Sequence, residues 1–313
     1  MIDITLQNFE ADLIQASMQQ PVLLDIWAPW CGPCRTLGPM LEKLETEYAG
    51  RFTLAKLNSD DQPEIAGQLS QAFGVRSIPF CVMFHQGQPV DGFVGALPEA
   101  QIRQFLDKHV PSTDALEAEQ ETEEAEALAA DGDTGAALDK LQHAVAIDPG
   151  NDAVRCDYVK LLIENGLVEQ ARSAYEPVAS KALVDARIAA LGHWLAACEK
   201  APTARSEAAL AAALQANKRD FDARFELAQT HFAAGRFTQA MDELLEIVMR
   251  DKAWSEELAR KTYVAILEVM AKPAPKPAAA EAKGTLEVTG KTAAVPADPV
   301  IDQYRRKLSM ALF

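Results

Sequence analysis

Apolar and polar positions follow two different patterns in the first third of the chain. Short, continuous apolar runs are typical of buried β-strands, whereas apolar residues three and four apart indicate amphipathic helices. The expected strands are 22–26, 52–57, 80–84 and 90–94, and the expected helices are 9–18, 36–48 and 99–109. The tetrapeptide HQGQ, with Gly87, predicts a hairpin turn between the last two strands. Because strands and helices alternate, residues 1–111 are expected to form an α/β domain.

A second pattern begins near residue 112, where Ala, Leu and Glu dominate and strand signals disappear. Glycine followed five residues later by alanine recurs at a spacing of 34 residues and then 69, which is close to two further periods. The pairs are Gly132 and Ala137, Gly166 and Ala171, and Gly235 and Ala240. A 34-residue helix–turn–helix unit is the tetratricopeptide period, in which the glycine turns the chain and the alanine lets helices approach. Residues 112–270 are therefore expected to be an all-α repeat domain.

The end of the chain changes composition again. Residues 271–299 are rich in Pro and Ala without periodicity, which predicts a flexible linker. Residues 300–313 return to helical spacing and predict a short amphipathic helix. Its apolar side would carry Ile301, Tyr304, Leu308 and Leu312, and its basic side Arg305, Arg306 and Lys307.

The charge of the chain and the length of its apolar runs exclude some functional classes. The 313 residues carry a formal net charge of −16, so a general nucleic-acid or anionic-membrane binder is not expected. Residues 111–150 supply much of this excess, with 11 acidic and one basic side chain. The N-terminus does not resemble a signal peptide, and apolar runs are too short to span a membrane. A cytoplasmic location is expected.

The chemistry-bearing motif is WAPWCGPC at 27–34, in which Cys31 and Cys34 follow a strand and open a helix. Backbone N–H groups at a helix N-terminus favour a thiolate, which is the nucleophile of disulfide exchange. We expect Cys31 to attack and Cys34 to resolve the mixed disulfide. A zinc site is the first alternative, but the chain has no second C-x2-C pair and no paired histidines. An inert buried pair is the second alternative.

Residues 1–110 resemble thioredoxin in several spaced features: the CGPC motif, Asp25, Lys56, Pro39, Ile78–Pro79 and Gly95. The resemblance implies a redox-active Cys31–Cys34 disulfide, Asp25 as proton acceptor and Lys56 as its modulator. It also implies a cis-proline at Pro79 and a substrate groove. That groove would be lined by Trp30, Gly32, Pro33, Ile78, Pro79 and Gly95. Phe80 departs from the family, where threonine is common, and is expected to alter either the groove or the strand packing.

The whole chain is similar to the bacterial chaperedoxins (the YbbN/CnoX group), which join a thioredoxin domain to tetratricopeptide-like repeats and end in a YRR-type helix. That resemblance implies a holdase chaperone that guards the cysteines of unfolding or oxidised clients. It implies transfer of those clients to the chaperonin GroEL/GroES and possibly to DnaK. The docking residues would be Tyr304, Arg305, Arg306, Leu308 and Leu312. Some members lack one active-site cysteine; this chain keeps both and is expected to be a reductase served by a thioredoxin reductase.

Two other hypotheses stay open. The repeats could be a non-enzymatic adaptor beside a vestigial thioredoxin platform, or a passive extension of an ordinary thioredoxin. No metal is expected, and no cofactor besides the disulfide. Cys81, Cys156 and Cys198 are expected to fill the core.

Overall fold

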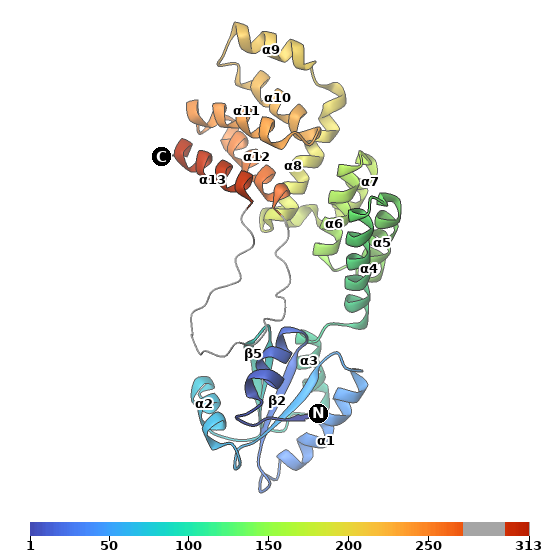
Figure 1. Cartoon of the computed structure of the whole chain (residues 1–313), viewed down its shortest axis with the longest axis vertical. Helices are drawn as coiled ribbons and strands as arrows, with labels where there is room; N and C mark the ends of the chain where they lie inside the picture. The colour runs from blue at the N-terminus through green and yellow to red at the C-terminus, as the bar shows by residue number, and fades with distance from the viewer. Residues whose placement is uncertain (272–297, 313) are drawn as a thin grey trace. The chain divides into compact units, whose positions relative to one another are not determined.

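The computed structural model describes residues 1–271 and 298–312 (Figure 1). Within these residues the chain divides into two compact units, the first ending at Thr113 and the second comprising 114–271 and 298–312. The expected α/β domain followed by helical repeats is confirmed. Most of the linker expected at 271–299 lies outside the described residues, as does residue 313.

The first unit is built on a five-stranded mixed sheet with the order β1-β3-β2-β4-β5. Its strands are β1 (Ile2–Asp3), β2 (Val22–Trp27), β3 (Thr53–Asn58), β4 (Phe80–His85) and β5 (Gln88–Val94). The central strand β2 runs parallel to β3 and antiparallel to β4. Residues 22–26 of β2 are all buried, which explains why four of the five are apolar; the exception is Asp25.

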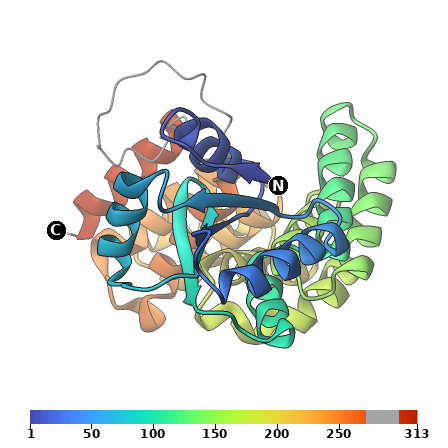
Figure 2. The ribbon, with the colours of Figure 1, turned by 90° about the horizontal axis from the view of Figure 1, so that it is seen from below.

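Helical segments cover both faces of this sheet (Figure 2). They are η1 (Phe9–Gln15), η2 (Ala16–Met18), α1 (Cys34–Glu47), α2 (Pro63–Phe73) and α3 (Glu99–His109). One core joins η1 and α2 to the face that carries Leu24 and Val82. The other core joins α1 and α3 to the face that carries Leu23 and Cys81. Alternate residues of each strand therefore reach different cores.

Three elements differ from the sequence expectation: β1, the helix expected at 9–18, and α2. The helix expected at 9–18 is a π-helical turn, η1, followed by the 3-10 turn η2. Helix α2 was not expected, because only Ile65 and Ala66 of its eleven residues are buried and Gly67 interrupts the pattern. Its two ends nevertheless carry common helix-end residues. Pro63 lies in the first turn, and Gly74, in the left-handed conformation, follows the last residue of the helix.

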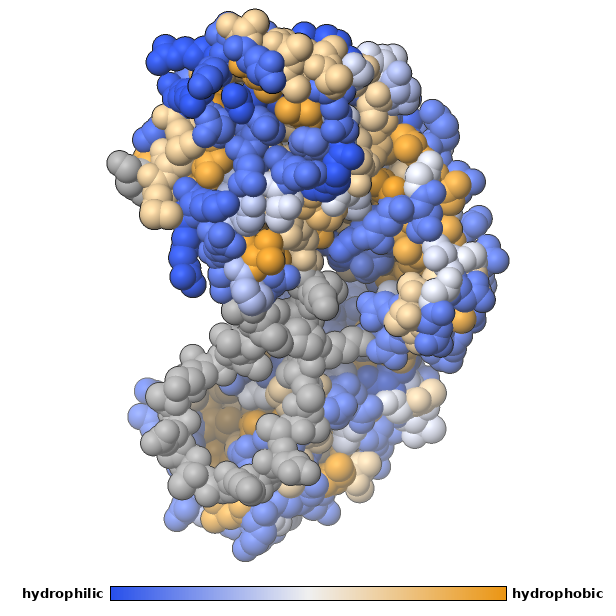
Figure 3. All heavy atoms as spheres, turned by 45° about the horizontal axis from the view of Figure 1, so that its top comes forward, coloured by the Kyte–Doolittle hydropathy of each residue, from blue (hydrophilic) through white to orange (hydrophobic). Residues whose placement is uncertain are grey.

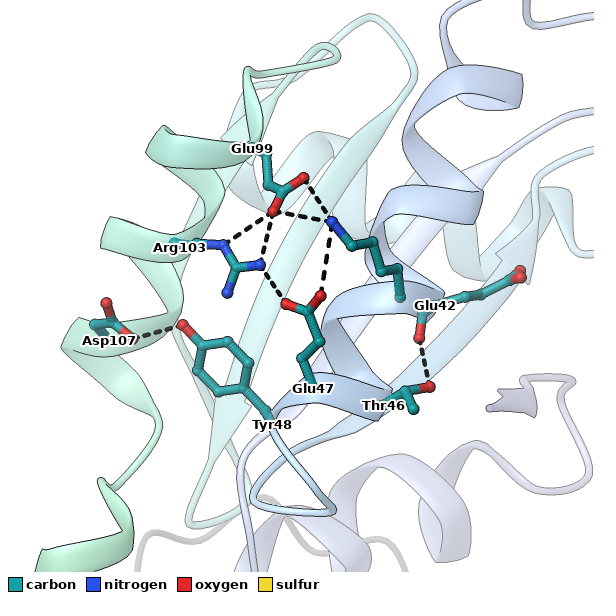
Figure 4. Close-up of polar contacts among 8 residues, drawn as sticks. Glu42, Thr46, Glu47, Tyr48, Glu99, Arg103 and Asp107 are labelled. Carbon is teal, nitrogen blue, oxygen red and sulfur yellow. Dashed lines mark hydrogen bonds and ion pairs between the residues drawn. The ribbon is translucent and has the colours of Figure 1, made fainter.

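Polar side chains fasten α1 to α3 on the outer surface (Figure 4). Arg103 bridges Glu47 and Glu99, and Lys43 pairs with the same two carboxylates. The Tyr48 hydroxyl donates to Asp107 Oδ1 at 2.5 Å one turn further along. These ion pairs form a network between α3 and α1, and α1 carries Cys34 at its start.

The second unit is helical. Its elements are α4 (Thr113–Ala130), α5 (Thr134–Ile147), α6 (Asp152–Glu164), α7 (Val168–Tyr175), η3 (Glu176–Leu183), α8 (Ala186–Lys200), η4 (Ala201–Thr203), α9 (Glu207–Ala216), α10 (Phe221–Ala233), α11 (Phe237–Arg250), α12 (Trp254–Met270) and α13 (Pro299–Leu312). None of the helices in the described ranges is long and apolar enough to cross a membrane.

The repeated glycines and alanines do what their spacing predicts. Gly132, Gly166 and Gly235 each have a positive φ, between 69° and 86°, and turn the chain between α4 and α5, α6 and α7, and α10 and α11. The alanines five residues later, at positions 137, 171 and 240, are completely buried between helices. The repeat is therefore a set of helical hairpins whose close packing depends on small side chains.

Helix α13 packs back onto the repeats, beside α11 and α12 (Figure 1). Ile301, Tyr304 and Leu308 are buried in the same apolar core as Ile247 and Tyr263. The apolar face that the sequence suggested for a partner is thus occupied within the chain. Amphipathic spacing indicates that one side of a helix is covered, but it does not identify what covers it.

Candidate active site

Cys31 and Cys34 form a disulfide at the start of α1, with their Cα atoms 5.3 Å apart. The backbone N–H of Cys34 donates to Cys31 Sγ at 3.2 Å. Both residues are almost buried, in a small cluster with Ala28, and Ile78 packs against it. In the reduced state a thiolate at Cys31 would face the unpaired N–H groups of the helix start, which stabilise negative charge.

Asp25 lies on β2, six residues before Cys31, and only 1% of its surface is exposed. Its neighbours along the strands on the same face, Leu23 and Cys81, belong to the core that α1 and α3 cover. Burial raises the pKa of Asp25 from 3.8 to about 6, against the opposing effects of Lys56 and a hydrogen bond from Cys81. A buried carboxyl that titrates near neutral pH is suited to accept and release a proton.

Lys56 pairs in register with Asp25 on the neighbouring strand β3. Its ammonium group forms an ion pair with Glu42 of α1. Lys56 lowers the pKa of Asp25 and Glu42 raises it, so the two charges act in opposite directions on the same carboxyl. The modulating role that the resemblance implied for Lys56 stays a prediction.

The peptide bond between Ile78 and Pro79, two of the expected groove residues, is cis, and Ile78 packs against the cluster of Cys31 and Cys34. The N–H of Gly95 donates to the carbonyl of Pro79 at 2.8 Å, and Gly95 has a φ of +86° that favours glycine. Trp30 is 69% exposed, and its indole N–H donates to the carboxylate of Asp60 at 3.1–3.2 Å. Gly32 and Pro33 are also exposed between the cysteines.

Phe80, the departure from the thioredoxin pattern, is buried in the core beneath α2. Its ring meets Phe73 of α2 edge to face, with ring centroids 5.5 Å apart. Phe80 thus contributes to the packing of β4 against α2.

Cys81 is the residue near the site that sequence reasoning assigned only to the core. It is a completely buried free cysteine, and its thiol lies 3.7 Å from Asp25 Oδ1. The signal that could have found it is the antiparallel pairing of two apolar runs, which places Cys81 directly opposite Asp25. That register depends on the hairpin and sheet order, neither of which is local in sequence.

The residues expected to dock a partner belong to the second unit. Tyr304 and Leu308 are buried against the repeats and Leu312 is partly buried, whereas Arg305 and Arg306 are exposed. The other free cysteines, Cys156 and Cys198, are buried and partly buried in the repeat core. Among the residues that the structure describes, no group of three or more His, Cys, Asp or Glu side chains is placed to hold a metal ion.

The sequence profile of the thioredoxin family matches residues 1–108. Two tetratricopeptide repeat profiles match residues 128–195 and 200–287.

Individual thioredoxins match about a third of the chain. Thioredoxin 1 of Nostoc sp. is 39% identical over 107 residues, which are 34% of this chain and 94% of that protein. A thioredoxin of Chlorobaculum thiosulfatiphilum is 43% identical over 104 residues, 33% of this chain and 91% of the relative. A thioredoxin of Haemophilus influenzae is 42% identical over 103 residues, which are 33% of this chain and 91% of that protein. These relatives, together with the Cys31–Cys34 disulfide, support a protein-disulfide oxidoreductase. The chain belongs to the thioredoxin family, and its thioredoxin domain is followed by tetratricopeptide repeats, consistent with the chaperedoxin architecture.

Proposed function

We propose that this protein is a disulfide reductase that also holds unfolding or oxidised clients through its repeats, in the reducing cytoplasm. The observation that carries the reductase role is the Cys31–Cys34 pair at the start of α1, on the same side of the sheet as the buried Asp25. A structural disulfide has no need of a buried carboxyl whose pKa lies near 6.

In the proposed reaction the Cys31 thiolate attacks a client disulfide, forms a mixed disulfide and displaces the first client thiolate. Asp25 takes the proton from the Cys34 thiol. The Cys34 thiolate then attacks Cys31 Sγ, which releases the second client thiolate and closes the Cys31–Cys34 disulfide. A thioredoxin reductase restores the dithiol with two electrons. The chemistry needs no bound cofactor beyond this disulfide.

Insulin reduction, with a thioredoxin reductase supplying electrons, tests this role. We expect turnover with the intact chain and none with Cys31→Ser. Cys198→Ser is the matched control, because Cys198 lies on α8 in the repeat core and is expected to leave turnover unchanged. Equal rates for the intact chain and Cys31→Ser would overturn the reductase assignment and favour the adaptor with a vestigial platform.

The client-holding role is supported by exposed aliphatic side chains at the end of η3. Leu183 is 94% exposed and Val184 is 90% exposed. Beside them lies a groove between α8 and α12, lined by small side chains such as Ala186, Ala190 and Ala265 and by the charged side chains of Glu257, Arg260, Lys261 and Glu268. The visible face of the repeats is otherwise mostly hydrophilic, with separate apolar patches (Figure 3). An apolar segment of an unfolded client would find both small side chains and exposed aliphatic groups there.

Suppression of aggregation of a chemically unfolded client tests this surface. The double change Leu183→Ser with Val184→Ser is expected to weaken suppression at least several-fold. Met249→Ser, which replaces an exposed apolar residue of α11, is the matched control and is expected to have no effect. Undiminished suppression by the double variant would remove this groove from the proposal, and no suppression by the intact chain would remove the holdase role.

Transfer of clients to the chaperonin GroEL/GroES, and possibly to DnaK, is proposed to use α13. Two faces of α13 are candidates: the buried one with Tyr304 and Leu308, which would have to leave the repeats, and the exposed one with Arg305, Arg306 and Met310. Because the exposed face requires no release, we favour it. Co-purification with the chaperonin should be lost in the charge-reversed double variant Arg305→Glu with Arg306→Glu, while helicity is unchanged. Retention in that variant would instead leave the buried face as the candidate.

A further inference from the structure

Asp25 occupies the middle of a row of three side chains across the sheet. The parallel pairing of β2 and β3 places Lys56 beside it, and the antiparallel pairing of β2 and β4 places Cys81 on its other side. Paired positions on neighbouring strands point to the same face. The face in question is the one covered by α1, where the active-site motif begins.

The contact between Cys81 and Asp25 has the geometry of a hydrogen bond. The Cys81 thiol donates to Asp25 Oδ1 at 3.7 Å, and both side chains are shielded from solvent. Burial and the neighbouring carboxylate raise the pKa of Cys81 well above its ordinary value, so the thiol keeps the proton that it donates. The ammonium of Lys56, on the opposite side, is engaged with Glu42 instead.

We propose that Cys81 is a positioning residue for the proton acceptor: its thiol holds Oδ1 of Asp25 and leaves Oδ2 to take the proton from Cys34. This inference rests on the proposed reductase function and adds to it a third cysteine that undergoes no redox change. Cys81 stays a thiol throughout, because it serves only as a hydrogen-bond donor to the carboxylate.

Three ionisable groups around Asp25 determine the direction of the expected effect. They are Lys56 on β3, Cys81 on β4 and Glu42 on α1. The Lys56 charge and the Cys81 hydrogen bond both favour the carboxylate, whereas burial and the Glu42 charge oppose it. Removal of the Cys81 donor alone must therefore make Asp25 harder to ionise, and a hydroxyl donor at the same place should compensate.

The test compares Cys81→Ala with Cys81→Ser in the reduced, full-length chain. The first readout is a carbon-13 NMR titration of the Asp25 carboxyl, which requires no turnover. The second is the pH profile for resolution of a preformed mixed disulfide on Cys31. We expect Cys81→Ala to shift the titration midpoint upward by about half a unit to one unit, and Cys81→Ser to leave it near the native value. Met83→Leu, on the same face of β4, is the control and is expected to shift neither readout.

The outcomes separate a positioning role from simple packing. Equal shifts in the alanine and serine variants, or no shift in either, would overturn the proposal and leave Cys81 as a core residue. If Cys81→Ala does not fold, Cys81→Val fills the volume without a donor and must show the same upward shift. In an Asp25→Asn background, Cys81→Ala should leave the pH profile unaltered. A donor-dependent titration shift without insulin reduction would refute the reductase function while the hydrogen-bonding role of Cys81 stands.

Discussion

The hydroxyl of Tyr304 donates a hydrogen bond to Asp242 Oδ1 at 3.1 Å and so joins α13 to α11. The same carboxylate oxygen pairs with Lys307 Nζ at 3.2 Å, and the hydroxyl of Tyr263 donates to the carbonyl of Tyr304 at 2.8 Å. Polar contacts therefore surround an aromatic side chain that is itself buried. The C-terminal helix is a component of the repeat core in this state of the protein.

This packing predicts a large loss of stability when Tyr304 is truncated. Tyr304→Ala removes a buried aromatic ring and leaves Asp242 without one donor, so we expect a cost of about 3–4 kcal/mol in the second unit. Urea unfolding, followed by hydrogen exchange of peptides from α11 and α12, measures it. Met310→Ala, at a side chain that is 73% exposed on the same helix, should stay within about 0.5 kcal/mol of the native chain. Similar values for both variants would mean that α13 contributes little to the repeat core.

The α13 result shows what local sequence can and cannot provide. The spacing of Ile301, Tyr304 and Leu308 correctly indicated a helix with one covered face, because that is a property of the helical period. The partner of the face depends on α11 and α12, which no local pattern identifies. The repeats were more predictable, because a glycine turn and a buried alanine recur in three of the hairpins.

In the first unit, too, local patterns were predictable and contacts between distant residues were not. The buried strands β2 and β4 were predictable from apolar runs, and Cys31 and Cys34 from their motif. Helix α2 was missed because little of it is buried, and β1 because it has only two residues. The contact between Asp25 and Cys81 was missed because it joins residues far apart in sequence through the register of two strands. The family resemblance named the expected catalytic residues but not this neighbour.

Two glycines of the first unit should respond oppositely to alanine. A Cβ at Gly92 in β5 would lie 2.8 Å from the carbonyl oxygen of Cys81 and 3.4 Å from the Phe80 ring, so Gly92→Ala must displace backbone. We expect a loss of about 1–3 kcal/mol. Gly67 lies mid-way along α2, where an added Cβ would have no atom within 4 Å, so Gly67→Ala should add up to about 1 kcal/mol through helix propensity. The stabilities of the two variants are compared by the urea midpoint for unfolding of the first unit in the oxidised chain. An increase in that midpoint on Gly92→Ala would contradict this packing.

The charges beside Asp25 should move its titration in opposite directions. Lys56→Gln removes the favourable charge and leaves Glu42 unpaired, so the pKa of Asp25 should rise by about one unit. Glu42→Gln removes a like charge from a partly exposed position and should lower the pKa by a few tenths of a unit. Carbon-13 NMR of the Asp25 carboxyl measures both. Lys43→Gln, whose partners are Glu47 and Glu99, is the control, and a shift of the same sign in all three variants would refute this account.

Asp25 should reduce the stability of the fold at neutral pH. A carboxyl with a raised folded-state pKa favours the native state at low pH, and this contribution disappears as pH rises through the folded pKa. Between the ordinary value of 3.8 and about 6, the native state pays an increasing cost for its buried charge. Over this interval the cost approaches about 3 kcal/mol, since one pKa unit corresponds to about 1.4 kcal/mol.

Asp25→Asn removes the titration while keeping the size of the side chain. The variant should therefore be more stable than the native chain above pH 6, by about 2–3 kcal/mol, and the difference should shrink towards pH 4. Its insulin reduction should fall at the same time, because Cys34 loses its proton acceptor. Urea unfolding of the oxidised chain at pH 4 and pH 7.5, followed by hydrogen exchange of peptides from β2 and β3, measures the stability difference. A difference that does not change with pH would show that the Asp25 carboxyl ionises in the fold as readily as in the unfolded chain.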